Sequence, residues 1–146
     1  MKIATRNEHD LTHTVFLREI DVAIERTREL QAVTLRKGRA YDVLAVDFFK
    51  GREPVFWVLG EEFPTRVADG LVYPDLIAAN DCRVVDATIP SGWVMRMNNI
   101  VGGTHTIVGV PLVTEAGFLE CLTDGEPVAV KLFLNLLDMA EQARME

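Results

Sequence analysis

The apolar positions near the start of the chain predict an amphipathic helix from Asp10 to about Leu30. Apolar residues recur there in steps of three to five, which matches one face of an α-helix. They are Leu11, Val15, Phe16, Ile20, Ala23, Ile24 and Leu30. Asp10 is a residue type that often begins a helix by accepting a backbone N–H. The stretch "THTVFLREI" contains β-branched residues early, so a strand remains the alternative for this part.

After a basic turn at 35–40, the pattern changes to short apolar and alternating runs that indicate β-strands. The predicted strands lie at 41–49, 54–60, 82–87, 93–99 and 105–113. The first two are joined by "KGRE", a turn of hairpin length, and are expected to pair. A glycine turn is predicted at 101–104. The segment 61–80 has two prolines and several acidic residues, and is predicted to be an irregular surface segment.

Two helices are predicted at the end of the chain. "TEAGFLECL" (114–122) fits a short helix that "TDG" ends. The last helix is expected to run from about Glu126 to Ala143, because Pro127 suits a first helical turn. Its buried stripe is predicted to contain Ala129, Leu132, Phe133, Leu136, Leu137 and Ala140.

These elements predict an α+β fold in a single domain, residues 1–146. An N-terminal helix precedes a strongly bent antiparallel sheet or small open barrel of about five strands, and two C-terminal helices follow. The length is that of one ordinary domain, and no internal repeat or linker interrupts the pattern.

Charge is distributed unevenly along the chain. Residues 1–40 carry eight Lys and Arg against six Asp and Glu, whereas residues 41–146 carry seven against sixteen, a net −9. An acidic body repels phosphate backbones, which argues against nucleic acid as a partner. It suits a basic protein partner, although acidic surfaces also simply keep proteins soluble.

The cysteines and the first residues indicate an intracellular protein. Cys82 and Cys121 are far apart and form no metal-ligand motif, so two free thiols are favoured, with one disulfide as the alternative. The N-terminus has no apolar leader, and no run approaches the ~18 apolar residues of a membrane span. We therefore expect a cytoplasmic location and no membrane contact.

The motif "DATIPSGWVMRMNN" (86–99) is interpreted as a structural turn. Pro90 suits the second position of a type I turn, which would place Gly92 at the fourth. Trp93 would then anchor the turn on the sheet. Ser91 as a nucleophile is the alternative, but it lacks the G-x-S-x-G pattern. Trp57 is expected to point to the opposite side of its strand from its neighbours and to be buried.

The histidines and glycines show no strong chemical motif. His9 and His13 are four apart and could bind a metal on one helical face, but no HExxH motif supports this. His105 is interpreted as a surface or turn histidine. "VGGTHTIVG" matches neither a Walker loop nor G-x-G-x-x-G. No catalytic residue, cofactor or metal is predicted.

The acidic segment around residues 60–81 is the predicted partner-binding site. Its candidate residues are Glu61, Glu62, Asp69, Tyr73, Asp75 and Asp81. Carboxylates beside an exposed aromatic ring form a plausible contact for a basic protein. The alternatives are a solvated loop docked on the body and, less favoured, paired carboxylates in general acid–base catalysis.

Three stretches carry a resemblance over about residues 33–140. They are "LRKGRAYDVLAV", "VYPDLIAANDCRVVDATIPSGWV" and "GFLECLTDGEPVAVKLFLNLL". The chain resembles small uncharacterised bacterial proteins associated with toxin systems, some of which act as immunity proteins. The resemblance implies a cytosolic, acidic protein that neutralises a basic toxin, and it carries over no functional residue set.

The leading hypothesis is therefore a non-enzymatic protein-binding module, most concretely an immunity protein that binds a basic toxin domain. The first alternative is a small-molecule-binding or hydrolytic domain. It would be favoured if two or more of His105, Asp86, Ser91 and Glu120 converged in one cleft. The second alternative is a structural or phage-type assembly protein, which would be favoured if the apolar last helix were exposed in the monomer and buried in an oligomer.

Overall fold

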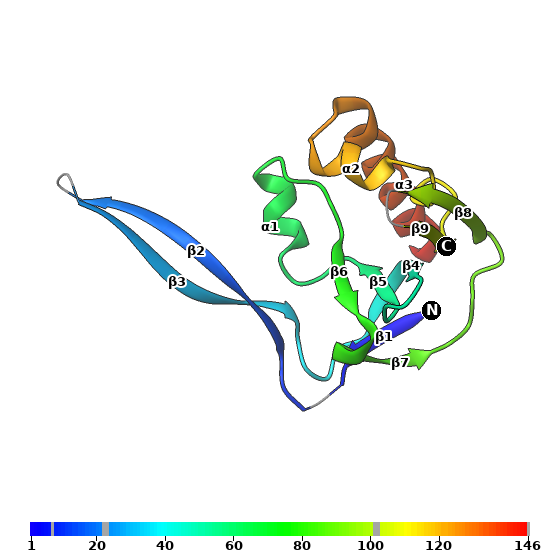
Figure 1. Ribbon diagram of the computed structural model, residues 1–146, viewed down its shortest axis with the longest axis horizontal. Coiled ribbons are helices and arrows are strands. Elements are labelled where there is room, and N and C mark those ends of the chain that lie inside the picture. Colours follow the sequence, from blue (N-terminus) through cyan, green and yellow to red (C-terminus); the bar gives the residue numbers. More distant parts are fainter. Residues whose placement is uncertain (7, 22–23, 101–102, 146) are drawn as a thin grey trace.

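The chain forms a body and a long two-stranded arm (Figure 1). The computed structural model describes residues 1–6, 8–21, 24–100 and 103–145. The arm consists of β2 (Leu11–Asp21) and β3 (Ile24–Leu35), which pair antiparallel along their whole length. Among the described strands, these two pair only with each other.

The body contains the remaining strands and all the described helices. The strands are β1 (Lys2–Thr5), β4 (Tyr41–Phe49), β5 (Val55–Val58), β6 (Asp75–Ala78), β7 (Cys82–Asp86), β8 (Val94–Ile100) and β9 (Gly103–Gly109). The helices are α1 (Phe63–Ala68), the short 3₁₀ helix η1 (Ala79–Asp81), α2 (Phe118–Thr123) and α3 (Pro127–Met145). None of the helices in the described ranges is long and apolar enough to cross a membrane.

Strand β4 lies at the centre of an antiparallel sheet. On one side it pairs with β5, which pairs in turn with β6. The other side is divided: the start of β4 pairs with β1, and its stretch from Ala45 to Phe49 pairs with β9. Strand β7 continues outward from β1, and β8 from β9. The α+β class with an antiparallel sheet and C-terminal helices is thus confirmed, but the outer strands do not join, so the barrel alternative is wrong.

The predicted N-terminal helix is also wrong, because its residues form the arm. Asp21 pairs with Ile24, and the pairing continues to Leu11 opposite Leu35. The early β-branched residues are compatible with extended backbone, and the antiparallel pairing of the two segments, which the helical spacing does not contain, fixes them as strands. Asp10 does not begin a helix; its Oδ1 accepts the backbone N–H of Lys37 at 2.7 Å. Residues 22–23, including the predicted helix position Ala23, lie outside the described ranges.

The other predicted elements agree with the structure to different degrees. The strand at 41–49 has the predicted limits, and the two C-terminal helices are present. The segment 61–80 is more ordered than predicted, since it contains α1, β6 and the start of η1. The predicted glycine turn at 101–104 partly lies outside the described residues, at 101–102.

The body buries apolar side chains on both faces of the sheet. Trp57 belongs to the cluster under the helices, which also contains Phe118 and Phe133, whereas Phe56 and Val58 belong to the opposite cluster with Ile3. The prediction for Trp57 is confirmed: its side chain is buried and lies opposite its two neighbours. Since all three are buried, β5 is covered on both faces.

Helix α3 is less deeply packed than predicted. Ala129 and Phe133 are buried, but the predicted stripe residues Leu132 and Ala140 are exposed. Val128 and Met139 are exposed as well. Positions 128, 132 and 139 lie on one side of a helix with 3.6 residues per turn. Helix α3 therefore has an apolar stripe that the described chain leaves uncovered.

Candidate functional site

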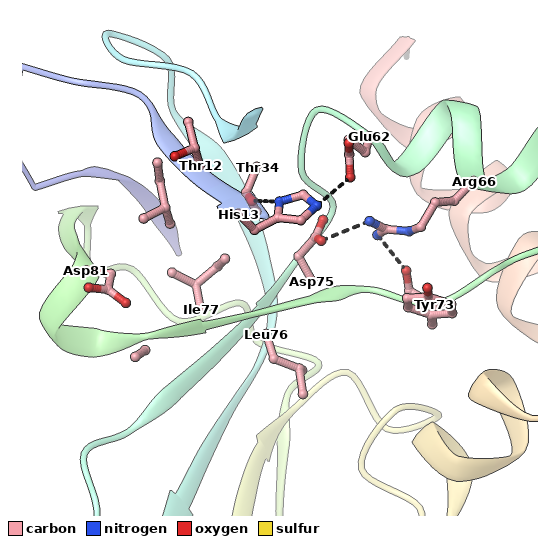
Figure 2. A pocket seen from close by; sticks show the side chains of 12 residues that line it. Thr12, His13, Thr34, Glu62, Arg66, Tyr73, Asp75, Leu76, Ile77 and Asp81 are labelled. Carbon is pink, nitrogen blue, oxygen red and sulfur yellow. Dashed lines mark hydrogen bonds and ion pairs between the residues drawn. The ribbon is translucent and has the colours of Figure 1, made fainter. Parts of the chain in front are cut away.

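A pocket of about 530 Å³ lies where the arm joins the body (Figure 2). Its wall comes from the first residues of β2, the end of β3, helix α1, the segment before β6, β6 itself and η1. The lining residues are Leu11, Thr12, His13, Thr34, Glu62, Arg66, Tyr73, Asp75, Leu76, Ile77, Ala78 and Asp81. The pocket is therefore built from both parts of the molecule.

His13 connects the arm to the body across this pocket. Its Nδ1 lies 2.5 Å from the Thr34 hydroxyl of the neighbouring strand, and its Nε2 lies 3.0 Å from a carboxylate oxygen of Glu62 (Figure 2). Glu62 precedes the first turn of α1. The contact with Glu62 becomes an ion pair only when the imidazole is protonated.

The second polar contact in the pocket joins α1 to β6. Arg66 donates from Nη1 to Asp75 Oδ1 at 3.0 Å and from Nη2 to the carbonyl of Tyr73 at 3.0 Å (Figure 2). Its guanidinium carbon lies 4.8 Å from the centre of the Tyr73 ring, within cation–π range. Both charged side chains are 13% exposed, so solvent screens this pair only weakly.

Gly60 allows the arm and the body to approach closely. A Cβ at this position would lie 2.5 Å from the carbonyl oxygen of Thr34 and 2.6 Å from Asp75 Oδ2. Two hydrogen bonds donated by backbone N–H groups occupy this space instead. Gly60 N–H donates to Asp75 Oδ2 at 2.9 Å, and the N–H of Glu61 donates to the Thr34 carbonyl at 2.9 Å. The end of β3 is thereby attached to the segment that leads into α1.

Glu61 makes a separate set of contacts outside the pocket. Its Oε1 accepts hydrogen bonds from Arg39 at 2.9 Å and from the Tyr41 hydroxyl at 2.5 Å. The Tyr41 hydroxyl also accepts the backbone N–H of Arg36 at 2.7 Å. The hydrogen bond from Tyr41 and the Arg39 charge together lower the pKa of Glu61. This cluster holds the turn between β3 and β4.

Four of the six predicted partner-binding residues meet in the pocket. Glu62, Tyr73, Asp75 and Asp81 line it, Glu61 faces a neighbouring groove, and Asp69 lies exposed at the end of α1. Three of the five predicted carboxylates already have internal ion-pair contacts: Glu61 with Arg39, Glu62 with His13, and Asp75 with Arg66. Asp69 and Asp81 are the exposed carboxylates of the set.

Among the pocket residues that sequence reasoning missed, three make the polar side-chain contacts described above: His13, Thr34 and Arg66. Arg66 left a signal, because it is the single basic residue between Glu61 and Asp81. A lone cation among carboxylates is expected to pair with one of them. His13, in the predicted helix, and Thr34, after its predicted end, left no such signal, because nothing in the sequence relates either residue to the acidic segment.

The turn motif at 86–99 has a different geometry from the one predicted. The backbone N–H of Trp93 donates to the carbonyl of Pro90 at 3.1 Å, so Pro90 is the first residue of the turn and not the second. Trp93 is partly buried against the cluster that contains Ile3. Ser91 is exposed. Cys82 and Cys121 are free thiols, and no group of three metal-type ligands gathers within the described part of the chain.

His105 is not a simple surface histidine. Its side chain is 14% exposed, and its Nε2 pairs with Asp47 Oδ1. His105 and Glu120 line the same cavity of about 260 Å³ under α2, whereas Asp86 and Ser91 are exposed in the segment that precedes β8. Two of the four residues named for the small-molecule alternative therefore converge.

No protein family, curated protein or solved structure matches the chain.

Proposed function

We propose that this chain is a non-enzymatic protein-binding module that contacts its partner with the β2–β3 arm. The observation that carries the proposal is the arm itself: eleven pairs of residues, with one register shift between Leu11 and Thr12, join two strands to which no other described strand is added. At ~3.4 Å per residue, an eleven-residue strand is roughly 37 Å long. The arm therefore reaches well beyond the body (Figure 1).

A two-stranded ribbon by itself is only marginally stable in water. Each outer edge of such a ribbon also presents backbone N–H and C=O groups that can pair with another strand. A partner that adds a strand or covers a face would provide the missing packing. The contacts of His13 and of the Thr34 carbonyl hold the base of the arm against the body, which supports a role as a positioned binding element.

The more specific form of the proposal is neutralisation of a basic toxin domain. Its support is the net charge of −9 in residues 41–146. Asp69 and Asp81 are the exposed candidates for charged contacts, because Glu61, Glu62 and Asp75 already contact basic side chains of the chain itself. Such contacts would mainly accelerate association and would weaken with salt.

A second candidate is self-assembly, as in a structural or phage-type protein. It is favoured by the apolar stripe of α3, where Val128 is 72%, Leu132 46% and Met139 61% exposed. Exposed apolar side chains along one helix face indicate an interaction surface. The two candidates differ in the partner: the binding module contacts a different protein, whereas the assembly protein contacts a second copy of this chain.

The test is an arm-shortened variant in which residues 16–29 are replaced by Asn-Gly. Val15 pairs with Leu30, so the two-residue turn closes the remaining hairpin in its existing register. The full chain and the variant are used to capture proteins from lysate of the source organism at low and high salt. Sedimentation velocity of each purified protein then measures self-association.

The proposal expects the variant to keep the circular dichroism spectrum of the body and to lose the captured partner. Partner loss at high salt, together with weaker capture by the double variant Asp69→Lys, Asp81→Lys, would support a basic partner. Self-association of the full chain that the variant lacks would instead support assembly. Equal capture and equal sedimentation of the full chain and the folded variant would exclude the arm as a binding element.

A further inference from the structure

The cavity under α2 contains a buried polar network beside apolar side chains. It lies between strands β4, β5 and β9 and the segment that leads into α2, and has a volume of about 260 Å³. Phe49, Trp57 and Ile107 contribute apolar surface. The Asp47 side chain is only 8% exposed and is held by the neighbouring strands: Trp57 Nε1 donates to Oδ2 at 3.1 Å, and His105 Nε2 pairs with Oδ1.

Burial of this polar network costs free energy of folding. Burial raises the pKa of the Asp47 carboxyl, and the His105 charge and hydrogen bond counteract that increase. Paired titratable groups in the wall of a largely apolar cavity are typical of ligand sites. If Asp47 served only to connect β4 with β5 and β9, its contacts with Trp57 and His105 would be explained, but the cavity beside them would not.

The charges of the lining residues decide which kind of ligand fits. Three carboxylates line the cavity, those of Asp47, Glu115 and Glu120, against one histidine. Glu115 is paired with Arg96 at 3.0 Å, but Glu120 is exposed and no ion pair to it exists among the described residues. Its charge acts on Asp47, whose pKa it raises. An anionic ligand would be repelled here, whereas a cation would be attracted.

The imidazole of His105 contributes a second polar group to the wall. Its Nε2 faces Asp47, so Nδ1 is the ring nitrogen that remains for a polar contact with a ligand. No residue within the described ranges bonds Nδ1. The ring also stacks on Phe49 with centroids 4.7 Å apart, which holds its orientation.

We propose that this cavity binds a small primary amine with an apolar body, independently of the protein partner of the arm. The ammonium group pairs with the Glu120 carboxylate, and the apolar part packs against Trp57. The volume of about 260 Å³ equals roughly nine water molecules at ~30 Å³ each, so a ligand of roughly ten non-hydrogen atoms fits.

The experiment compares three aromatic probes of similar size and different charge: benzylamine, benzyl alcohol and benzoate. Each is titrated into the full ¹⁵N-labelled protein and followed by the amide signals and the Trp57 indole signal. The proposal expects benzylamine to bind at least about tenfold more tightly than benzyl alcohol, and benzoate not to bind. The shifted signals should be those of Trp57, His105 and their neighbours.

Two matched variants separate this site from unspecific attraction to an acidic protein. Glu120→Gln is expected to weaken benzylamine binding about fivefold. Asp124→Asn removes the same charge from the end of the same helix, outside the cavity lining, and should leave the affinity unchanged. Both positions are exposed, so both variants should fold.

The proposal is overturned if the three probes bind equally, if none produces shifts at Trp57 or His105, or if Asp124→Asn weakens binding as much as Glu120→Gln. A preference for the amine that falls about fivefold with Glu120→Gln and is unchanged with Asp124→Asn supports it. Capture of a protein partner by the arm is a separate result, so failure of one proposal leaves the other testable.

Discussion

Replacing Arg66 by methionine tests whether the pair with Asp75 stabilises the base of the arm. Methionine keeps much of the aliphatic length of arginine but removes the charge and all donors. The change deletes the hydrogen bonds to Asp75 and to the Tyr73 carbonyl, each 3.0 Å long, and the cation–π contact with the Tyr73 ring. It also leaves the Asp75 carboxylate, which is 13% exposed, without a countercharge.

The magnitude follows from the burial of the pair. Removing one partner of a buried ion pair costs about 3–5 kcal/mol, because the other charge stays desolvated. Since a small part of both side chains still reaches solvent, we expect the lower end, about 3 kcal/mol. For a chain of this size, that corresponds to a fall in Tm of roughly 6–12 °C.

The assay is urea denaturation followed by tryptophan fluorescence and circular dichroism, applied as a double-mutant cycle. Asp75→Asn removes the charge but keeps an oxygen that can accept the Gly60 N–H. The double variant should lose less stability than the sum of the single variants, with a coupling energy of at least about 1 kcal/mol. Arg52→Met, in an exposed turn, is the control and should change stability by less than about 0.5 kcal/mol.

Two outcomes would refute this reasoning. If the two single variants added to the double variant within about 0.3 kcal/mol, the side chains would not be coupled. If Arg66→Met were no more destabilising than the control, solvent would screen the pair as it does a surface pair.

Three further predictions concern the body. Gly109→Ala should destabilise the fold by about 1–3 kcal/mol, because the new Cβ would lie 2.5 Å from the Ala45 Cβ. Urea denaturation measures this change, and an unchanged midpoint would show that β4 and β9 can separate at low cost. Phe133→Ala should cost about 3–5 kcal/mol, as for a fully buried aromatic residue. Val128→Ala, on the exposed side of α3, should change the free energy of unfolding by less than about 0.5 kcal/mol. Similar losses of stability for Phe133→Ala and Val128→Ala would contradict the observed orientation of the helix. Burial raises the pKa of the Cys82 thiol to about 11, so iodoacetamide at pH 8 should label it far more slowly than in urea, as mass spectrometry can measure. Because the unfolded thiol ionises first, the free energy of unfolding should also fall as the pH rises from about 9 to about 11.

Local patterns were sufficient for several elements of the body. The alternation in 41–49 marked β4 with its observed limits, because that pattern repeats every two residues and a helix cannot match it. The same period showed that Trp57 lies opposite Phe56 and Val58. It could not show that both sides are buried, since burial of the second face depends on elements from other parts of the chain.

The arm was mispredicted for a related reason. Apolar positions three to five apart are compatible with a helical face, and they also occur on strands that are not packed on a body. What decides between the two is the pairing of Leu11–Asp21 with Ile24–Leu35, a tertiary contact that no spacing rule within either segment contains. The exposed stripe on α3 was also missed, because the presence of apolar residues on a helix does not show which side of the helix the body covers.

For the candidate sites, the sequence by itself determined the residue types and their charge: an acidic body, one arginine among the carboxylates of 61–81, and a histidine beside a glycine turn. Only the tertiary structure decided which of them meet. Asp47 and His105 are 58 positions apart and pair because β4 and β9 are neighbouring strands. His13 reaches Glu62 because the first residues of β2 lie beside the start of α1. Local propensity acts between neighbours in the chain, whereas a binding site is formed by distant residues that sheet pairing and core packing bring together.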